Sequence, residues 1–440
     1  MRILVLGSGG REHALAWKLG LEPGVESVLC APGNPGLART VQTSAVDPLD
    51  PDAVLRLVRD RRIDLTVVGA EAPLSRGLVD RFDREGLRIF GPSRVAAQLE
   101  SSKAFAKDFM HRHGVPTARY RVCTDADAAI AAIRSGEFGD ALVVKADGLA
   151  AGKGVVVAPD RATAEDAVRA AMLDRSFGDA GSRVVLEELL TGPEVSFFIV
   201  ADGEAYVPLL SAQDHKRIFD EDLGPNTGGM GAFAPSPLMT PEVQAQVERE
   251  VVRPVLQGMA SEGHPFRGFL YCGLMLTPDG PKVIEFNVRF GDPEAQVVLP
   301  IVEEPLAPLL LAAAEGRLSG TGNREPGTGP SPQALKPSSP QVSVGVVLAA
   351  HGYPAEVRSG DVIHGLDALA RECPDILVFH AGVKARDGEL VTSGGRVLTI
   401  VARDTAFEPA IARVYDAVSR VRFEGMQYRR DIGQKALSRQ

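Results

Sequence analysis

The sequence contains few cysteines, no long apolar segment and no excess of positive charge. The four cysteines lie far apart, which predicts reduced side chains in a cytoplasmic protein and indicates neither a zinc site nor a disulfide framework; they are Cys30, Cys123, Cys272 and Cys373. The apolar run 3–6 is interrupted by glycines and is too short for a signal peptide, and no segment approaches the ~20 apolar residues that span a membrane. A net charge of −9 argues against broad binding of nucleic acid and gives no reason to expect affinity for anionic membranes. An anionic ligand would therefore need a local cluster of donor groups.

The chain is too long to fold around one compact core. With 440 residues it should form three or four domains, and its 24% charged and 45% hydrophobic residues are ordinary for a soluble globular protein. One segment, 319–341, is rich in Gly, Pro and Ser without apolar periodicity and is predicted to be a linker.

The most informative pattern is a predicted strand at 282–289, which continues into Phe290-Gly291-Asp292-Pro293-Glu294. A period of two places Glu285, Asn287 and Arg289 on one face. The opposite, core-facing side is expected to carry Ile284, Phe286 and Val288. A carboxylate and an amide oxygen suit Mg²⁺, and an arginine beside them can stabilise a phosphoryl group. The alternative is a solvent-facing strand with polar residues at every second position.

The N-terminus predicts a phosphate-binding turn. A strand over 1–6 leads into Gly7-Ser8-Gly9-Gly10 and then a helix over 11–19, so backbone N–H groups and a helix N-terminus can approach an anion. A dinucleotide site is disfavoured because Glu12 stands where that fingerprint has its third glycine, and because the next strand ends without an acidic residue. We expect a smaller phosphate here, at the edge of an open parallel sheet.

A second glycine-rich loop lies between the predicted strands 141–145 and 155–157. It is not a P-loop, because the glycine spacing is short by one, no Ser or Thr follows Lys153, and a strand comes next. A flap of this kind can fold over a triphosphate with backbone donors, whereas the alternative is a plain surface hairpin. Further along, the polar run 213–217 and the glycine-rich run 224–231 are candidate substrate loops. Strands over 342–349, 375–381 and 396–401 and a helix over 407–421 predict a small C-terminal α+β domain.

These motifs together resemble those of ATP-grasp ligases, and most closely those of the phosphoribosylamine–glycine ligase family of purine biosynthesis, over nearly the whole chain. The resemblance rests on the runs 7–13, 102–107, 144–154, 213–217, 224–231 and 289–296. It implies an α/β multidomain fold with an N-terminal open parallel sheet domain, a central ATP-grasp fold with a lid subdomain, and a small C-terminal α+β domain. The expected boundaries are 1–101 for the N-terminal domain, 102–120 with 191–318 for the ATP-grasp core, 121–190 for the lid, 319–341 for the linker and 342–440 for the C-terminal domain.

The resemblance also implies an activity: ATP, glycine and 5-phosphoribosylamine give ADP, phosphate and glycinamide ribonucleotide through glycyl phosphate. It assigns catalysis to Arg289, Asp214 and Lys145, and Mg²⁺ or Mn²⁺ to Glu285 and Asn287. ATP is assigned to Lys103, Lys145, Gly148, Gly152, Lys153, Gly154, Glu187, Glu188, Leu189 and Glu194. The other substrates are assigned to Gly9, Gly10, Arg11, Asp214, Lys216, Arg289, Gly291 and Asp292. A monomer is expected, with no nucleic-acid or membrane partner.

Three other functions remain open on the residues alone. A nucleotide-linked oxidoreductase would use the N-terminal glycine turn but leaves the 145–154 flap unexplained. A non-catalytic ATP sensor would tolerate the loss of Arg289 or Asp214. A ligase of the same fold with another acceptor is disfavoured by resemblance only. One departure from many ATP-grasp enzymes is that the strand expected to pair with 282–289 carries no carboxylate between Phe269 and Leu276.

Overall fold

The computed structural model describes residues 1–148, 154–318 and 341–437, and it begins with a parallel sheet. All pairs in the order β3-β2-β1-β4-β5 are parallel, so the predicted open parallel sheet is confirmed. The strands are β1 (Arg2–Gly7), β2 (Ser27–Pro32), β3 (Gln42–Thr43), β4 (Leu65–Val68) and β5 (Ile89–Phe90), with helices α1 (Gly10–Gly20), α2 (Pro51–Arg61), α3 (Glu71–Ser75) and α4 (Leu78–Arg84) between them. Because β1 and β4 are mostly apolar and buried, with Arg2 at the start of β1 and Thr66 within β4 as their polar residues, their polar loops are confined to the strand ends.

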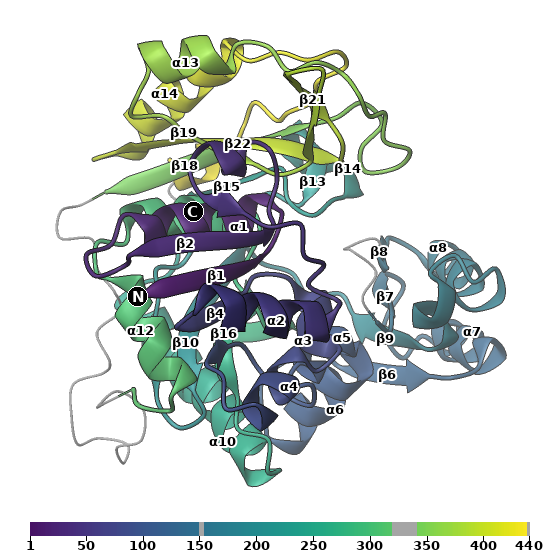
Figure 1. Ribbon diagram of the computed structural model, residues 1–440. Coiled ribbons are helices and arrows are strands. Elements are labelled where there is room, and N and C mark those ends of the chain that lie inside the picture. Colours follow the sequence, from purple (N-terminus) through teal and green to yellow (C-terminus); the bar gives the residue numbers. More distant parts are fainter. Residues whose placement is uncertain (149–153, 319–340, 438–440) are drawn as a thin grey trace.

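The lid is a separate antiparallel sheet with the order β6-β9-β7-β8, and Figure 1 shows it standing apart at the right of the molecule. Its elements are β6 (Tyr120–Cys123), α7 (Ala126–Ser135), β7 (Leu142–Ala146), β8 (Val155–Ala158), α8 (Arg161–Val168) and β9 (Val184–Glu188). The predicted flap strands are present as the antiparallel pair β7 and β8. The loop between them, with Gly152 and Lys153, lies outside the described residues.

The central sheet has the order β11-β10-β16-β17 and carries the polar row on its last strand. Its strands are β10 (Glu194–Asp202), β11 (Tyr206–Pro208), β16 (Arg267–Thr277) and β17 (Gly280–Asn287), accompanied by helices α5 (Gln98–Ser101), α6 (Lys103–Arg112), α9 (Pro241–Val247) and α10 (Arg253–Ser261). Phe286 and Val288 are buried against the core that these helices share with the N-terminal sheet.

The alternation along β17 is interrupted at Ile284, and the prediction that this side chain faces the core is wrong. Glu285 pairs with Gly273, whereas the next partner of β16, Leu274, pairs with Val283, so Ile284 is the extra residue of a β-bulge. Val283 takes the buried position instead, and Ile284 is half-buried and lines the cavity described below. The predicted polar face at 285, 287 and 289 keeps its phase because it lies beyond the bulge.

The C-terminal sheet has the order β12-β15-β18-β22-β19 and includes two strands from the middle of the chain. The strands are β12 (Gln213–Asp214), β15 (Gly231–Ala234), β18 (Val342–Ala349), β19 (Leu377–His380) and β22 (Arg396–Asp404). Helices α13 (Leu366–Glu372) and α14 (Phe407–Ser419) belong to the same region, which Figure 1 shows at the top of the molecule. The substrate loops 213–217 and 224–231 are therefore attached to the sheet of the C-terminal region by β15, which pairs with β18.

Two short hairpins and two further helices are also present. The hairpin β20 (Val383–Arg386) and β21 (Glu389–Thr392) was not predicted, although Asp387-Gly388 between its strands is a recognisable turn signal, with both residues at positive φ. The others are the hairpin β13 (Arg217–Phe219) with β14 (Leu223–Asn226) and the helices α11 (Glu294–Val298) and α12 (Leu306–Ala314). Among the described residues no single helix is long and apolar enough to cross a membrane; by length and composition alone, only the helical pair 294–301 and 306–314, bent by 114°, passes that test. Residues 319–340 of the predicted linker lie outside the described residues.

Candidate active site

A cavity of about 1040 Å³ lies where the lid, the central sheet, the N-terminal sheet and the C-terminal region meet. Most of the residues predicted for the site line it: Arg11, Lys103, Lys145, Gly148, Gly154, Glu187, Glu188, Leu189, Glu194, Asp214, Lys216, Glu285, Asn287, Arg289, Gly291 and Asp292. Gly9 and Gly10 are not among the lining residues. The rest of the sequence-derived set, Gly152 and Lys153, falls in the part of the chain that the structure does not describe.

A buried ion triad joins the lid to helix α6. The Glu187 carboxylate of β9 lies 2.8 Å from Lys145 Nζ of β7 and 2.7 Å from Lys107 Nζ of α6. Lys107 also donates to Thr117 Oγ1, and Lys145 donates to the carbonyl oxygen of Ile284 at 3.0 Å. Burial lowers the pKa of Lys107 to about 8, although the Glu187 carboxylate opposes the shift. The bulge in β17 thus presents a carbonyl that holds Lys145 over the cavity.

The root of the flap is fixed to the start of α6 by Asp147. Its Oδ1 atom accepts from the Ser102 hydroxyl at 3.0 Å and from the Ala104 N–H at 3.1 Å, while its Oδ2 atom accepts from Arg183 Nε at 2.6 Å. Lys103, the first residue of α6, donates to the Gly148 carbonyl oxygen at 2.9 Å. The two cations predicted to contact nucleotide phosphates, Lys103 and Lys145, therefore lie at the flap and line the same cavity.

The polar row of β17 faces a lysine from the substrate loop. Lys216 Nζ lies 2.9 Å from a Glu194 carboxylate oxygen and 3.7 Å from Glu285 Oε1. Burial alone would raise the pKa of Glu285, but the Lys216 and Lys145 ammonium groups hold it below its ordinary value. An ionised carboxylate beside the Asn287 amide oxygen is a donor pair of the kind that Mg²⁺ accepts together with phosphate oxygens and water. Among the described residues no group of three or more His, Cys, Asp or Glu side chains is arranged for a metal ion, so a metal here would rest on few protein ligands.

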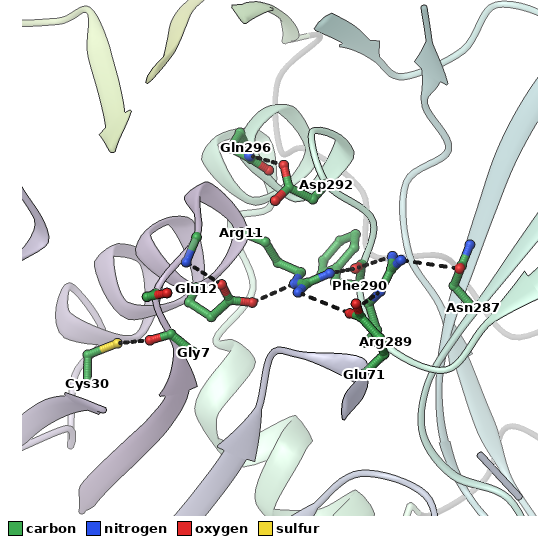
Figure 2. Close-up of polar contacts among 12 residues, drawn as sticks. Gly7, Arg11, Glu12, Cys30, Glu71, Asn287, Arg289, Phe290, Asp292 and Gln296 are labelled. Atoms are coloured by element: carbon green, nitrogen blue, oxygen red, sulfur yellow. Dashed lines mark hydrogen bonds and ion pairs between the residues drawn. The ribbon is translucent and has the colours of Figure 1, made fainter. Parts of the chain in front are cut away.

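Arg289 is held by two carboxylates that the sequence did not single out as site residues. Its Nη2 atom lies 3.0 Å from Glu100 Oε1 of α5 and its Nε atom 3.4 Å from Glu71 Oε2 of α3, and it also donates to Asn287 Oδ1 at 3.2 Å. Figure 2 shows Glu71 between Arg289 and Arg11, and the Nη2 atom of Arg11 lies 3.7 Å from Glu71 Oε2. Although burial opposes it, the two guanidinium groups lower the pKa of Glu71. Glu100 also accepts the Val288 N–H, so the guanidinium and its backbone are fixed together.

The N-terminal glycine turn binds the chain's own Glu12. The Gly9 N–H donates to Glu12 Oε2 at 2.6 Å. Arg11 Nε donates to Glu12 Oε1, also at 2.6 Å, as Figure 2 shows. A Cβ atom at Gly7 would lie 2.3 Å from Glu12 Cγ, and one at Gly69 would lie 2.4 Å from the same side chain. The missing third glycine of a dinucleotide site is thus explained, because this carboxylate fills the space beside the turn. Arg11, directly after the predicted phosphate-binding turn at 7–10, lines the cavity.

A cluster of acidic and hydroxyl groups lies at the substrate side of the cavity. Burial raises the pKa of Asp214 to about 7, with Lys216 opposing and Glu294 adding to the shift. The Ser196 hydroxyl lies 3.2 Å from Glu294 Oε1 and 3.1 Å from the Tyr271 hydroxyl oxygen. Asp214, Tyr271 and Glu294 all line the cavity.

The C-terminal region adds residues that no local pattern marked as functional. Arg396 Nη1 of β22 donates to the carbonyl oxygens of Gly228 and Asp292, each at 2.7 Å, and lies 3.2 Å from Asp292 Oδ1. The Tyr353 hydroxyl accepts the Gly228 N–H at 2.9 Å. These contacts join the glycine-rich loop to the 289–294 segment. Of the missed residues, only Glu71, three residues after the end of β4, and Lys107, in the 102–107 motif, carried a usable signal in the sequence.

Three family models match successive parts of the chain. They are the phosphoribosylglycinamide synthetase N domain at residues 1–100, the ATP-grasp (A) domain at 101–295 and the C domain at 343–435. The chain is 48% identical to a phosphoribosylamine–glycine ligase of Vibrio parahaemolyticus, covering 100% of this chain and 99% of that protein. It is 51% identical to one of Xanthomonas axonopodis pv. citri, again over 100% of this chain and 99% of the relative.

Solved structures agree with these matches. The crystal structure of a phosphoribosylamine–glycine ligase from Thermotoga maritima has a TM-score of 0.83 at 34% identity and covers 98% of this chain and 100% of its own. A biotin carboxylase from Campylobacter jejuni has a TM-score of 0.69 at 15% identity over 99% of this chain and 94% of its own, which shows a shared fold. Since near-half identity extends along the whole chain and each of its three parts matches the corresponding model, the chain belongs to the phosphoribosylglycinamide synthetase (phosphoribosylamine–glycine ligase) family of ATP-grasp proteins.

Proposed function

We propose that the chain ligates glycine to 5-phosphoribosylamine at the expense of ATP, giving glycinamide ribonucleotide, ADP and phosphate in purine biosynthesis. The observation that carries this proposal is that one cavity is lined by Lys103 and Lys145, by the Glu285–Asn287–Arg289 row and by residues of the 213–217 loop. A dinucleotide-dependent oxidoreductase is disfavoured, because Glu12 fills the space beside the N-terminal glycine turn.

Nucleotide binding is assigned to the lid side of the cavity. Lys103 and Lys145 are assigned to the phosphates, and the flap residues Gly148, Gly152, Lys153 and Gly154 are assigned to the cover over them. The backbone at 187–189 would hold the adenine, and Glu194 the ribose hydroxyls. The Glu187 carboxylate itself is paired with Lys145 and Lys107, so its contribution is to fix Lys145.

A divalent ion, Mg²⁺ or Mn²⁺, fits the donor set at Glu285 and Asn287. The Glu285 carboxylate is kept ionised by the neighbouring ammonium groups, and Asn287, whose amide oxygen accepts from Arg289, lines the same cavity. When bound, such an ion neutralises charge on the terminal phosphates of the nucleotide.

The chemistry requires positioning and charge rather than a protein nucleophile, because the glycine carboxylate itself attacks the γ-phosphate. Arg289 is placed to stabilise the acyl phosphate that forms, and the carboxylates Glu100 and Glu71 hold its guanidinium in position. Asp214 and Lys216 would orient glycine. The phosphoribosyl group would be oriented by Arg11, Gly291 and Asp292. Gly9 and Gly10, which do not line the cavity, would form the turn that carries Arg11. The amine of the sugar then displaces phosphate from glycyl phosphate.

The division into domains is also proposed. Residues 1–101 would form the N-terminal domain, which presents the sugar-phosphate side of the site. The ATP-grasp core would comprise 102–120 and 191–318, and the lid 121–190. The linker 319–341 would join the core to the C-terminal domain, 342–440. We further propose a cytoplasmic monomer. Its four free cysteines, three buried and one half-buried, are consistent with a reducing compartment, and light scattering on the purified chain tests the oligomeric state.

The test is ADP release from ATP with phosphoribosylamine generated in situ, comparing glycine, alanine and no amino acid. Release that depends on both glycine and the amine, with glycinamide ribonucleotide as product, is expected. Release that is indifferent to glycine would contradict the assignment. Light scattering that gives twice the chain mass would contradict the monomer without affecting the chemistry.

A further inference from the structure

In the proposed reaction, no residue has yet been assigned to take the proton from the attacking amine and deliver it to the leaving phosphate. When the sugar amine attacks the carbonyl carbon of glycyl phosphate, an N–C bond forms and the C–O bond to phosphate breaks. The nitrogen becomes positively charged until it releases a proton. The residues assigned so far bind phosphates, the metal ion or glycine, and none of them takes up this proton.

Glu294 is a buried carboxylate at the substrate side of the cavity to which no role has been given. It begins helix α11 directly after the 289–293 segment, has 3% relative exposure and lines the cavity. Its Oε2 atom lies over Gly291, where a Cβ atom would be only 2.4 Å away. Within the described residues no lysine or arginine nitrogen lies within 4.0 Å of this carboxylate, so it is in no ion pair with them.

A hydrogen-bond chain holds the Glu294 carboxylate. Ser196 Oγ lies within hydrogen-bonding distance of both Glu294 Oε1 and the Tyr271 hydroxyl oxygen. A serine hydroxyl has one proton, and a carboxylate can only accept, so Ser196 donates to Glu294 and Tyr271 donates to Ser196. The chain fixes Oε1, and the second oxygen, Oε2, lies over Gly291, which also lines the cavity.

The surroundings favour the protonated form of Glu294. Burial raises the pKa of Glu294 above its ordinary value, although a backbone hydrogen bond, Arg289 and Lys216 oppose the shift. The carboxylate of Asp214 faces the same volume, and its pKa is raised to about 7. A carboxylate with a raised pKa is suited to general base catalysis at the pH of the cell.

We propose that Glu294 accepts the proton that the attacking sugar amine releases as phosphate leaves glycyl phosphate. This inference rests on the proposed function. In the step, the N–C bond forms while the amine gives its proton to a Glu294 oxygen, and the C–O bond breaks with its electron pair on the phosphate. Glu294 then passes the proton to the leaving phosphate, which departs as HPO4²⁻, and the carboxylate is restored.

Hydroxylamine separates this step from the one before it. It is a strong, neutral nucleophile that converts an acyl phosphate to a hydroxamate without assistance from a base. In Glu294→Gln, glycine- and ATP-dependent hydroxamate formation should stay within about twofold of the wild type. Formation of glycinamide ribonucleotide should fall by about 100-fold or more, the usual scale for a lost general base.

Glu248→Gln is a matched control. Glu248 is equally buried, at 3% relative exposure, and accepts a hydrogen bond from the Tyr206 hydroxyl at 3.0 Å, but it does not line the cavity. This variant should keep both rates. Hydroxamate formation also shows that the variant active site is folded; if Glu294→Gln does not fold, Glu294→Asp serves instead, with the same split expected between the two products.

The outcomes are distinct. A Glu294→Gln enzyme that forms the ribonucleotide within about threefold of the wild-type rate overturns the proposal, on the scale expected of a general base. Equal loss of hydroxamate and ribonucleotide overturns it too, because the residue would then act before the amine attacks. A wild-type enzyme that forms no glycine hydroxamate refutes the proposed function, and this step with it.

Discussion

Replacing Glu187 by glutamine should loosen the attachment of the lid to helix α6. The substitution keeps the shape of the side chain but removes the one negative charge between two buried ammonium groups, Lys145 and Lys107, at 2.8 and 2.7 Å. At an effective dielectric constant of about 20, each contact represents about 6 kcal/mol of gross attraction. Much of that is offset by dehydration of the ions, and removing one partner of a buried pair costs about 3–5 kcal/mol.

Amide hydrogen exchange measures the effect where it should occur. The peptides covering Leu142–Ala146 and Val184–Glu188 should exchange about 100-fold faster or more, which corresponds to about 3 kcal/mol of local opening free energy. The loss of protection from exchange caused by Glu187→Gln should be smaller at about pH 9 than at pH 7. Lys107, whose pKa is about 8, is then mostly neutral and needs no carboxylate.

The neighbouring Glu188 provides the control. Its carboxylate pairs at 2.6 Å with Arg119, whose side chain is 65% exposed, so Glu188→Gln should cost less than about 1 kcal/mol. Equal exchange rates in the two variants would refute the reasoning, because the buried triad would then contribute no more than a surface ion pair.

Three further substitutions test the site. Arg289→Ala should keep ATP binding, measured by calorimetric titration, but lower ADP release by about 100-fold or more, since a charged donor to the acyl phosphate is lost; unchanged turnover would favour an ATP sensor. Glu285→Gln should raise the Mg²⁺ concentration for half-maximal activity by about tenfold or more, and an unchanged requirement would move the metal elsewhere. The pKa of Asp214 is raised from 3.8 to about 7, so its stabilising contribution is present below about pH 4 and is lost as pH rises through 7. Asp214→Asn should therefore destabilise the protein less at pH 8 than at pH 5 in scanning calorimetry, and the reverse order would contradict that pKa.

The sequence was informative wherever function and local periodicity coincide. Glu285, Asn287 and Arg289 could be placed on one face because the strand pattern has a period of two, and the structure places all three at one cavity. The position of Ile284 could not be read in the same way. The bulge depends on which residues of β16 pair with β17, and that register is set by a distant segment.

Long-range contacts account for most of what the sequence did not reveal. Glu100 and Arg396 come from segments with ordinary helix and strand patterns, and their roles arise only when those segments meet the 287–292 region. The glycine turn at 7–10 gave a true structural signal, a strand–turn–helix. The acceptor of the Gly9 N–H, however, is a side chain three residues later. Distinguishing an internal acceptor from a bound phosphate required the coordinates.

The pairing of β15 with β18 has a consequence for any attempt to shorten or divide this enzyme. The loop proposed to bind glycine and the glycine-rich loop adjoin the short strands β12 and β15, and the outer neighbour of β15 is β18, which comes more than a hundred residues later. A protein ending at Leu318 would retain the polar row of β17 and the lysines of the lid, but it would expose an unpaired strand edge and lose Arg396 from the glycine-rich loop. The C-terminal region thus forms one side of the proposed active site. It cannot be exchanged between homologues as an independent module unless strands β12 and β15 are exchanged with it.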